Sequence, residues 1–273
     1  MNFTAARSAY LAHAWDSMVI TRERAAMALD ARKVLAKKPI YTDVEQETGV
    51  PWWFVAVVDM REGGIEHLGT RHLHNGDHLT AYTVNEPRGR PQVGHGPPFT
   101  WRESAIDSIE YQGLDKIKRW TIERALHQLE SYNGFKYALQ RPPRPSPYDW
   151  SCCSIYDPPG GPGGKVLVDH GPIVDIDPKT GGPMIDPQYG CAPFLRVLAE
   201  LDSTIHFARE AAAPSVLPPT GATAKGGAVI VAGTAAGKAA AGMGFSPGLV
   251  VFLAFVGAFV VAAGIYFVSN RSK

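Results

Sequence analysis

The stretch PWWFVAVVDMRE, residues 51–62, is the most informative part of this 273-residue chain for its fold. It is apolar on nearly every side of a helix, whereas a helix at a protein surface keeps one polar face. Pro51 suits the first turn of a helix, and Gly63-Gly64 supplies a stop. These features predict a central, buried helix that ends at Glu62.

Helical patterns flank this segment on both sides. Spaced apolar positions predict one or two helices over residues 3–36, and a short turn at residues 41–47 leads into the buried helix. Thr100 and Glu103 have the spacing of a capping box before WRESAIDSIEYQ. Further helices are expected over residues 117–132, ending at Asn133-Gly134, and over residues 191–211.

The expected β structure is small. LTAYTVNEPRGRP, residues 79–91, alternates and then breaks at Pro87 and Gly89, which predicts a small β-ribbon. Residues 141–190 are rich in Pro and Gly and predict loops, with a short strand at KVLVDHG, residues 165–171. The fold class that follows is mainly α with a minor β part (α+β).

The C-terminal part has a different composition. LVVFLAFVGAFVVAAGIYFV, residues 249–268, carries no charge, and as a helix it would span about 30 Å, the thickness of a bilayer core. Residues 213–248 have the Ala, Gly and Pro content of a linker, and residues 269–273 form a short basic tail. We expect a single transmembrane helix at 249–268. A buried core helix is the alternative, but such a helix seldom ends a chain as an uninterrupted apolar run.

Charge and cysteine content restrict the function classes. The formal net charge is +1, so no basic surface indicates a nucleic-acid partner. Cys152 and Cys153 are adjacent and Cys191 is distant, which is not a disulfide framework, and C-x-x-C metal spacing is missing. MNFTAARSAYLAHAWDS has no unbroken apolar stretch, so we expect no signal peptide.

Glu62 is the candidate catalytic acid. Its apolar surroundings and the negative end of the helix dipole both disfavour the ionised carboxylate. A carboxyl group that stays protonated near neutral pH can donate a proton to a glycosidic oxygen. The simpler alternative is an ion pair with Arg61 or another cation at the helix end.

A second catalytic group is expected at Asp77, which follows a glycine turn fifteen residues later. It could hold a water or attack the sugar, as second carboxylates do in glycosidases, or it could only shape the HNGD loop. Asp59 and Glu66 are substitutes for either carboxylate. The nearby histidines also allow a metal site, but no H-E-x-x-H spacing is present, so we predict no metal and no cofactor.

Several motifs together resemble one family. REGG, HLHNGDHLTAYTVNEPRGRP, PPFTWRESAIDSI, LHQLESYNGFKY and SPYDWS lie within residues 60–156. This pattern resembles bacterial and phage proteins of the lysozyme and endolysin group, although His78 stands where proline is usual. The resemblance implies a lysozyme-like helical domain over residues 1–212, with Glu62 as its acid.

The resemblance also implies substrate-binding residues. Tyr132-Asn133-Gly134 is similar to the Tyr-Asn-Gly element that lines the sugar cleft of goose-type lysozymes and lytic transglycosylases, although the triplet also suits a plain helix C-cap. Tyr148 and Trp150 offer flat faces for sugar rings or are loop anchors packed on the core. His74 and its neighbour Asn75 serve either substrate hydrogen bonding or loop packing.

The leading hypothesis is therefore a muramidase-type glycoside hydrolase that cleaves peptidoglycan glycan strands. A lytic transglycosylase is expected instead if the substrate's own hydroxyl replaces Asp77. The rivals are a non-catalytic, membrane-held cell-wall binding module and a metal-dependent hydrolase. The expected partners are peptidoglycan and the lipid bilayer. Arg271 and Lys273 favour a cytoplasmic C-terminus, which would place the domain on the cell-wall side.

Overall fold

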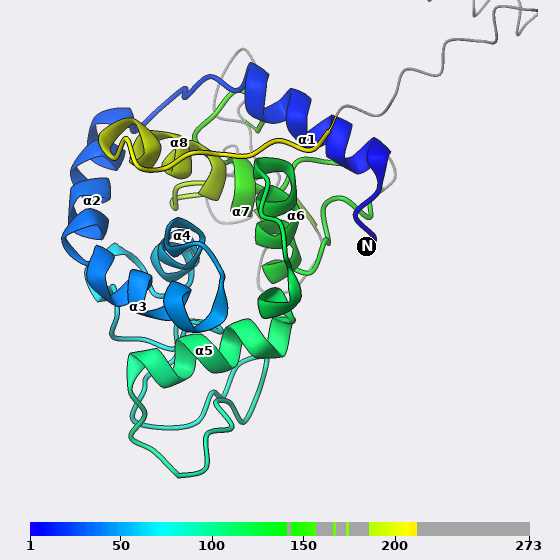
Figure 1. Ribbon diagram of the computed structural model, residues 1–273. Coiled ribbons are helices and arrows are strands. Elements are labelled where there is room, and N and C mark those ends of the chain that lie inside the picture. Colours follow the sequence, from blue (N-terminus) through cyan, green and yellow to red (C-terminus); the bar gives the residue numbers. More distant parts are fainter. Residues whose placement is uncertain (141–142, 157–165, 168–172, 175–185, 212–273) are drawn as a thin grey trace, which may run out of the picture. The chain divides into compact units, whose positions relative to one another are not determined.

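The helix at residues 52–62 is the centre of the fold. In the computed structural model, which describes residues 1–140, 143–156, 166–167, 173–174 and 186–211, α4 (Trp52–Glu62) lies among the other helices (Figure 1). Every residue from Trp52 to Arg61 is buried, and α3 and α8 pack against α4. The prediction of a central helix is confirmed, since only an interior position can bury apolar residues on all sides.

The described part of the chain is mainly helical, as predicted. Alongside α4, α2 packs on α8, α1 on α6 and α3 on α5. Thr100 and Glu103 form the predicted capping box. The other elements are α1 (Ala5–Ser17), α2 (Arg24–Ala36), α3 (Lys38–Thr48), η1 (Ile65–His67), α5 (Trp101–Gln112), η2 (Leu114–Lys116), α6 (Ile122–Tyr132), α7 (Pro147–Trp150) and α8 (Cys191–Leu201).

Three helix boundaries differ from the prediction. Residues 41–47 belong to α3 instead of a turn, because Tyr41 and Val44 share one buried face three residues apart. The helix expected at 117–132 begins at Ile122, since the hydroxyl of Thr121 caps it by accepting from Arg124 N. The last helix ends at Leu201, and residues 205–211 instead lie beside the start of α6, where Ile122 N donates to Ala208 O.

The β-ribbon predicted at residues 79–91 is wrong. Residues 79–91 contain no strand, and an isolated bridge lies just before them, between Arg71 and His78. Side chains take up backbone groups that a ribbon would pair, since Asp77 accepts from Val84 N and Thr83 Oγ1 accepts from Arg90 N. The described strands are β1 (Val166–Leu167) and β2 (Ile173–Val174), which pair antiparallel, and β1 lies within the predicted strand at 165–171.

The chain divides into two units, residues 1–213 and 214–273. The predicted linker, transmembrane helix at 249–268 and basic tail lie outside the described residues. Among the helices that the structure describes, none has both the length and the apolar character needed to span a bilayer. Cys152, Cys153 and Cys191 are buried and form no disulfide, in agreement with the prediction that they are not a disulfide framework.

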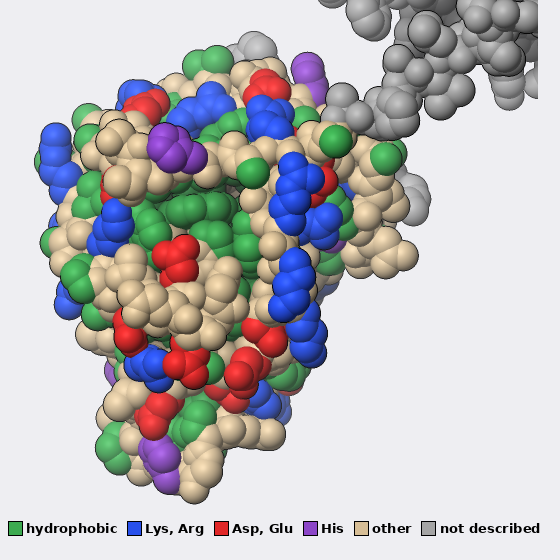
Figure 2. Space-filling model, in the orientation of Figure 1, with side chains coloured by type: hydrophobic (Ala, Val, Ile, Leu, Met, Phe, Trp, Pro, Cys, Tyr) green, Lys and Arg blue, Asp and Glu red, His purple; other side chains and the backbone are tan. Residues whose placement is uncertain are grey.

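Charges of both signs share the face seen in Figure 2. Several are paired at the surface, for example Arg24 with Glu200, and Arg102 with Asp43 and Glu47. Such exposed pairs contribute little to folding, about 0–1 kcal/mol each. The stability of the domain therefore depends on the apolar core around α4.

Candidate active site at Glu62

Glu62 is the last residue of α4 and is partly exposed, whereas the ten residues before it are buried. Burial of its carboxyl group raises its pKa to about 7, although a hydrogen bond from Tyr148 and the charge of Arg61 both oppose the rise. The negative end of the α4 dipole also disfavours the carboxylate. Glu62 can therefore hold a proton near neutral pH, and part of the residue is exposed at the end of the helix.

Tyr148 lies directly against this carboxyl group. Its phenol donates a 2.6 Å hydrogen bond to Oε1 of Glu62, and only 7% of the residue is exposed. The guanidinium carbon of Arg61 lies 4.9 Å from the centre of its ring. We predicted Tyr148 as a sugar-stacking residue or a core anchor, and its burial and contacts favour an anchor that also holds Glu62.

The helix that carries Tyr148 is fixed by Asn133. Ser146 caps α7 by accepting from Tyr148 N, and Asn133 Nδ2 lies 3.2 Å from the same Ser146 hydroxyl oxygen. Asn133 is the C-cap of α6, and Gly134 follows it with φ of +69°. In this structure Asn133 therefore positions Tyr148 indirectly, while Gly134 ends the helix and is exposed.

Tyr132 also lies near the carboxyl group. Burial raises its pKa above the ordinary value, and the charge of Glu62 adds to the rise. Its phenol oxygen lies 3.4 Å from the hydroxyl of Ser108 on α5. The predicted residues Glu62, Tyr132 and Tyr148 are thus brought together from α4, α6 and α7.

Arg61 fixes the other side of the site. Its Nη2 lies 2.9 Å from Oδ2 of Asp186, and both side chains are largely buried. Nη1 donates to the carbonyl of Tyr189, and the amide of Gln188 donates to the carbonyl of Arg61. Residues 186–189 are therefore docked on the end of α4, next to Glu62.

The HNGD loop touches Glu62 through its glycine. Gly76 has φ of +76°, and a Cβ at this position would lie 2.2 Å from the carbonyl oxygen of Glu62. Only glycine allows an approach as close as this in that conformation. The loop that carries Asp77 is therefore in direct contact with the backbone of the candidate acid.

The Asp77 carboxylate is occupied by its own loop. It accepts from Val84 N, Asn85 N and Asn85 Nδ2 at 2.8–3.0 Å. Partial burial alone would raise its pKa, but the hydrogen bonds from Asn85 and Val84 hold the pKa below the ordinary value. Asp77 is thus an ionised carboxylate that shapes the loop beside Glu62.

Asn75 and His74 have packing roles in this structure. Asn75 Oδ1 accepts from Asp77 N and its amide donates to the carbonyl of Asn85, which closes the loop. The side chain of His74 is 1% exposed, and Nε2 lies 2.8 Å from Oδ2 of Asp107. Asp107 also binds Arg90 through both oxygens. The contacts favour loop packing over substrate binding for both predicted residues.

Trp150 requires a correction. It is 1% exposed and lies in the core, so neither face of the indole is available to a sugar ring. Of the two roles considered for it, the structure supports the core anchor. The sequence alone does not distinguish these roles, because a loop-rich stretch has no periodic pattern that shows whether a tryptophan is buried or exposed.

The alternative carboxylates also have structural roles. Asp59 is buried and accepts from Tyr41, Trp101 and Gly69 N, while burial raises its pKa to about 6. Glu66 is exposed and pairs with Lys33. Within the described residues, no three His, Cys, Asp or Glu side chains are grouped as a metal site.

Asp149 is a buried acid that the sequence reasoning missed. It follows Tyr148 in α7, is fully buried, and neither carboxyl oxygen has a hydrogen-bond partner. Burial raises its pKa to about 8, against the opposing charges of Arg7 and Arg61. The capping pattern Ser146-Pro147 could have indicated the short helix, but no local signal shows that Asp149 faces inward.

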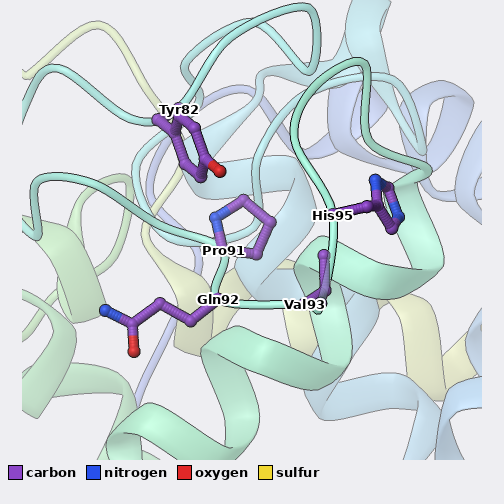
Figure 3. A pocket seen from close by; sticks show the side chains of 6 residues that line it. Tyr82, Pro91, Gln92, Val93 and His95 are labelled. Carbon is purple, nitrogen blue, oxygen red and sulfur yellow. The ribbon is translucent and has the colours of Figure 1, made fainter.

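A shallow hollow lies on the loop that precedes α5 (Figure 3). It has a volume of about 440 Å³ and is lined by Tyr82, Pro91, Gln92, Val93, Gly94 and His95. None of the predicted site residues lines it. The candidate catalytic group is therefore defined by the contacts of Glu62 and not by this hollow.

Comparison with known proteins assigns neither a family nor a function to this chain. No protein-family model, curated protein or solved structure matches the chain. The residues around Glu62 are therefore the basis for assigning a function to this protein.

Proposed function

We propose that this protein cleaves peptidoglycan glycan strands and that its helical domain is lysozyme-like, with Glu62 as the general acid. The observation that carries the proposal is a partly exposed glutamate at the end of a buried helix, whose carboxyl group has its pKa raised by burial to about 7. Such a group is protonated in part of the population at neutral pH and can transfer its proton to a leaving oxygen.

In the first step, Glu62 donates its proton to the oxygen that links N-acetylmuramic acid to N-acetylglucosamine. The C–O bond breaks as positive charge develops on the sugar ring. Tyr148 supports the step because its hydrogen bond fixes the position of the carboxyl group. The Glu62 carboxylate that remains then serves as a base for the acceptor hydroxyl.

The acceptor distinguishes two candidate reactions. In hydrolysis, water attacks the ring carbon, and Asp77, whose loop contacts Glu62 through Gly76, is the candidate carboxylate for the developing charge. Asp77, however, already accepts three hydrogen bonds from residues 84 and 85. This observation favours a lytic transglycosylase as the second candidate, in which a hydroxyl group of the muramyl residue closes an anhydro ring.

Membrane attachment through residues 249–268 is the second part of the proposal. The charged tail would remain in the cytoplasm, which puts the catalytic domain on the cell-wall side. Protease protection on intact cells and on opened vesicles tests this topology. A domain that stays protected in spheroplasts and is digested only in inverted vesicles, whose cytoplasmic face is outside, would contradict it if the cells never lyse.

Loss of turbidity of purified Gram-negative sacculi tests the function. The full chain is added as wild type, as Glu62→Gln, and as wild type with a chelator. We expect clearing by the wild type with or without chelator, and none by Glu62→Gln. Inhibition by the chelator would favour the metal-dependent hydrolase. Sedimentation of the protein with intact sacculi, without clearing, would favour the non-catalytic binding module.

A further inference from the structure

The hollow lined by Tyr82, Gln92 and His95 has an exposed aromatic ring held in a fixed position. Tyr82 is 43% exposed, and its ring meets the buried ring of Phe99 at a centroid distance of 5.0 Å. The imidazole of His95 also packs on Phe99, at 5.7 Å. An aromatic ring that is already ordered loses little entropy when a ligand packs on it.

Apart from His95, the lining of the hollow is uncharged. It contains no Asp, Glu, Lys or Arg side chain. Both ring nitrogens of His95 are occupied, Nδ1 by the carbonyl of Gly96 and Nε2 by Glu103 at 2.9 Å. The charge of His95, when protonated, is therefore matched by Glu103. A phosphate or a metal ion would find no complementary charge here, so a neutral ligand is favoured.

The remaining groups suit a ligand with one apolar face and several hydroxyl or amide groups. Figure 3 shows the ring of Tyr82 beside Pro91, with Gln92, Val93 and His95 following along the chain. Gln92 and Tyr82 are both exposed, so that a ligand can reach the side-chain amide and the phenol. The volume of about 440 Å³ falls within the range of small-ligand sites, about 300–1,000 Å³.

The same loop touches the candidate acid. Asp77 accepts from the backbone of Val84 and Asn85, which follow Tyr82 closely, and Gly76 packs on the carbonyl of Glu62. The loop therefore links the hollow to the end of α4 through few residues. A long polymer bound by this loop would be held near Glu62.

We propose that this hollow is a carbohydrate-binding site for an N-acetylhexosamine unit of a glycan strand, separate from the residues that contact Glu62. A sugar ring would pack its apolar face on Tyr82, while the Gln92 amide bonds to a hydroxyl or acetamido group. The inference rests on the proposed function for the choice of glycan. It adds a second point of attachment that holds an insoluble strand on the protein.

Calorimetric titration with the tetramer of N-acetylglucosamine tests the site, with the full chain carrying Glu62→Gln so that no turnover occurs. We expect saturable binding that Tyr82→Ala weakens about tenfold or more, with a smaller loss for Gln92→Ala. Tyr82→Phe should retain most of the affinity, because it keeps the ring. Circular dichroism confirms that each variant is folded.

Tyr111→Ala is the matched control. Tyr111 is 53% exposed and packs on Arg90 of the same loop, but it does not line the hollow. Absence of binding by the folded parent, or equal affinity of the Tyr82→Ala and Tyr111→Ala variants, would overturn the inference. Sacculus clearing by the wild type is measured separately. A failure to bind the tetramer together with normal clearing would therefore refute only the carbohydrate-binding site at the hollow. Tyr82-dependent binding without clearing refutes only the enzyme.

Discussion

The phenol of Tyr148 donates a 2.6 Å hydrogen bond to Oε1 of Glu62, which joins α7 to the last residue of α4. The two residues are 86 positions apart in the chain. Burial raises the pKa of Glu62 to about 7, and the Tyr148 bond limits that rise because it stabilises the carboxylate. This contact therefore affects both the position and the protonation of the candidate acid.

Replacement of Tyr148 by Phe tests that relationship. The variant lacks the hydrogen bond, so the pKa of Glu62 should rise further, by about one unit. The pH profile of kcat/KM should then keep activity to higher pH, while maximal activity falls because the carboxyl group is less well held. The profile is measured with solubilised sacculi. An unchanged alkaline limb in a folded Tyr148→Phe variant would show that the bond does not tune Glu62.

Gly76→Ala tests the contact between the HNGD loop and Glu62. The new Cβ would lie 2.2 Å from the Glu62 carbonyl oxygen, in addition to the strain at φ of +76°. We expect a loss of more than about 2 kcal/mol of unfolding free energy in urea, together with a loss of activity.

Gly89→Ala is the control for this experiment, since Gly89 has φ of +73° but nothing within 4 Å of the added Cβ. It should cost only the backbone strain, about 1 kcal/mol, and keep activity. Equal effects of the two variants would mean that the close approach at Glu62 has no consequence.

The buried carboxyl group of Asp149 should make the free energy of unfolding fall as pH rises. Its pKa is about 8 in the folded protein and ordinary, near 3.8, in the unfolded chain. Between these values the folded state binds more protons, so unfolding free energy falls as pH rises from about 4 to 8, by at most about 1.4 kcal/mol per pH unit. Glu62 and Asp59 contribute with the same sign. Asp149→Asn should therefore reduce the decline in urea unfolding experiments.

Asp77→Asn serves as the opposite case. The folded pKa of Asp77 is lowered, so its contribution to stability is present above its ordinary pKa and is lost as pH falls. Its removal should flatten the acid side of the stability curve and leave the alkaline side unchanged.

A decline toward pH 8 as steep in Asp149→Asn as in the wild type would contradict the assignment of a protonated Asp149.

Asp107 binds both His74 and Arg90, so its replacement should destabilise the protein. Asp107→Ala leaves a largely buried guanidinium without its carboxylate, which should cost about 3–5 kcal/mol in urea unfolding. Asp43→Ala breaks an exposed ion pair with Arg102 and should cost at most about 1 kcal/mol. If Asp107→Ala were no more destabilised than Asp43→Ala, the packing role assigned to His74 would be wrong.

The sequence predicts features that local patterns control. The apolar run of α4, its end at Glu62 and the capping box at Thr100 and Glu103 are all found where they are expected. Residues 79–91 were mispredicted because alternation alone does not reveal that Asp77 and Thr83 take up the backbone hydrogen bonds. Local patterns therefore fail where a side chain competes with a strand for the backbone.

The candidate site was predictable only in part. Glu62 is identifiable because it ends an apolar helix, which is a local feature. The role of Tyr148 depends on α7 meeting α4, and the burial of Trp150 on the packing of the core, neither of which has a local signature. His74 and Asn75 were found as polar residues near the site, but their partners Asp107 and Asn85 come from tertiary contacts.

Product analysis tests the central claim most directly. Sacculi are digested with the wild type, with Glu62→Gln and with Glu66→Gln, a control at an exposed glutamate, and the soluble material is analysed by mass spectrometry. We predict disaccharide-containing muropeptides from the wild type and Glu66→Gln alone, with either reducing or anhydro muramyl ends. The same products from Glu62→Gln, or none from the folded wild type, would contradict Glu62-dependent cleavage of the glycan strand.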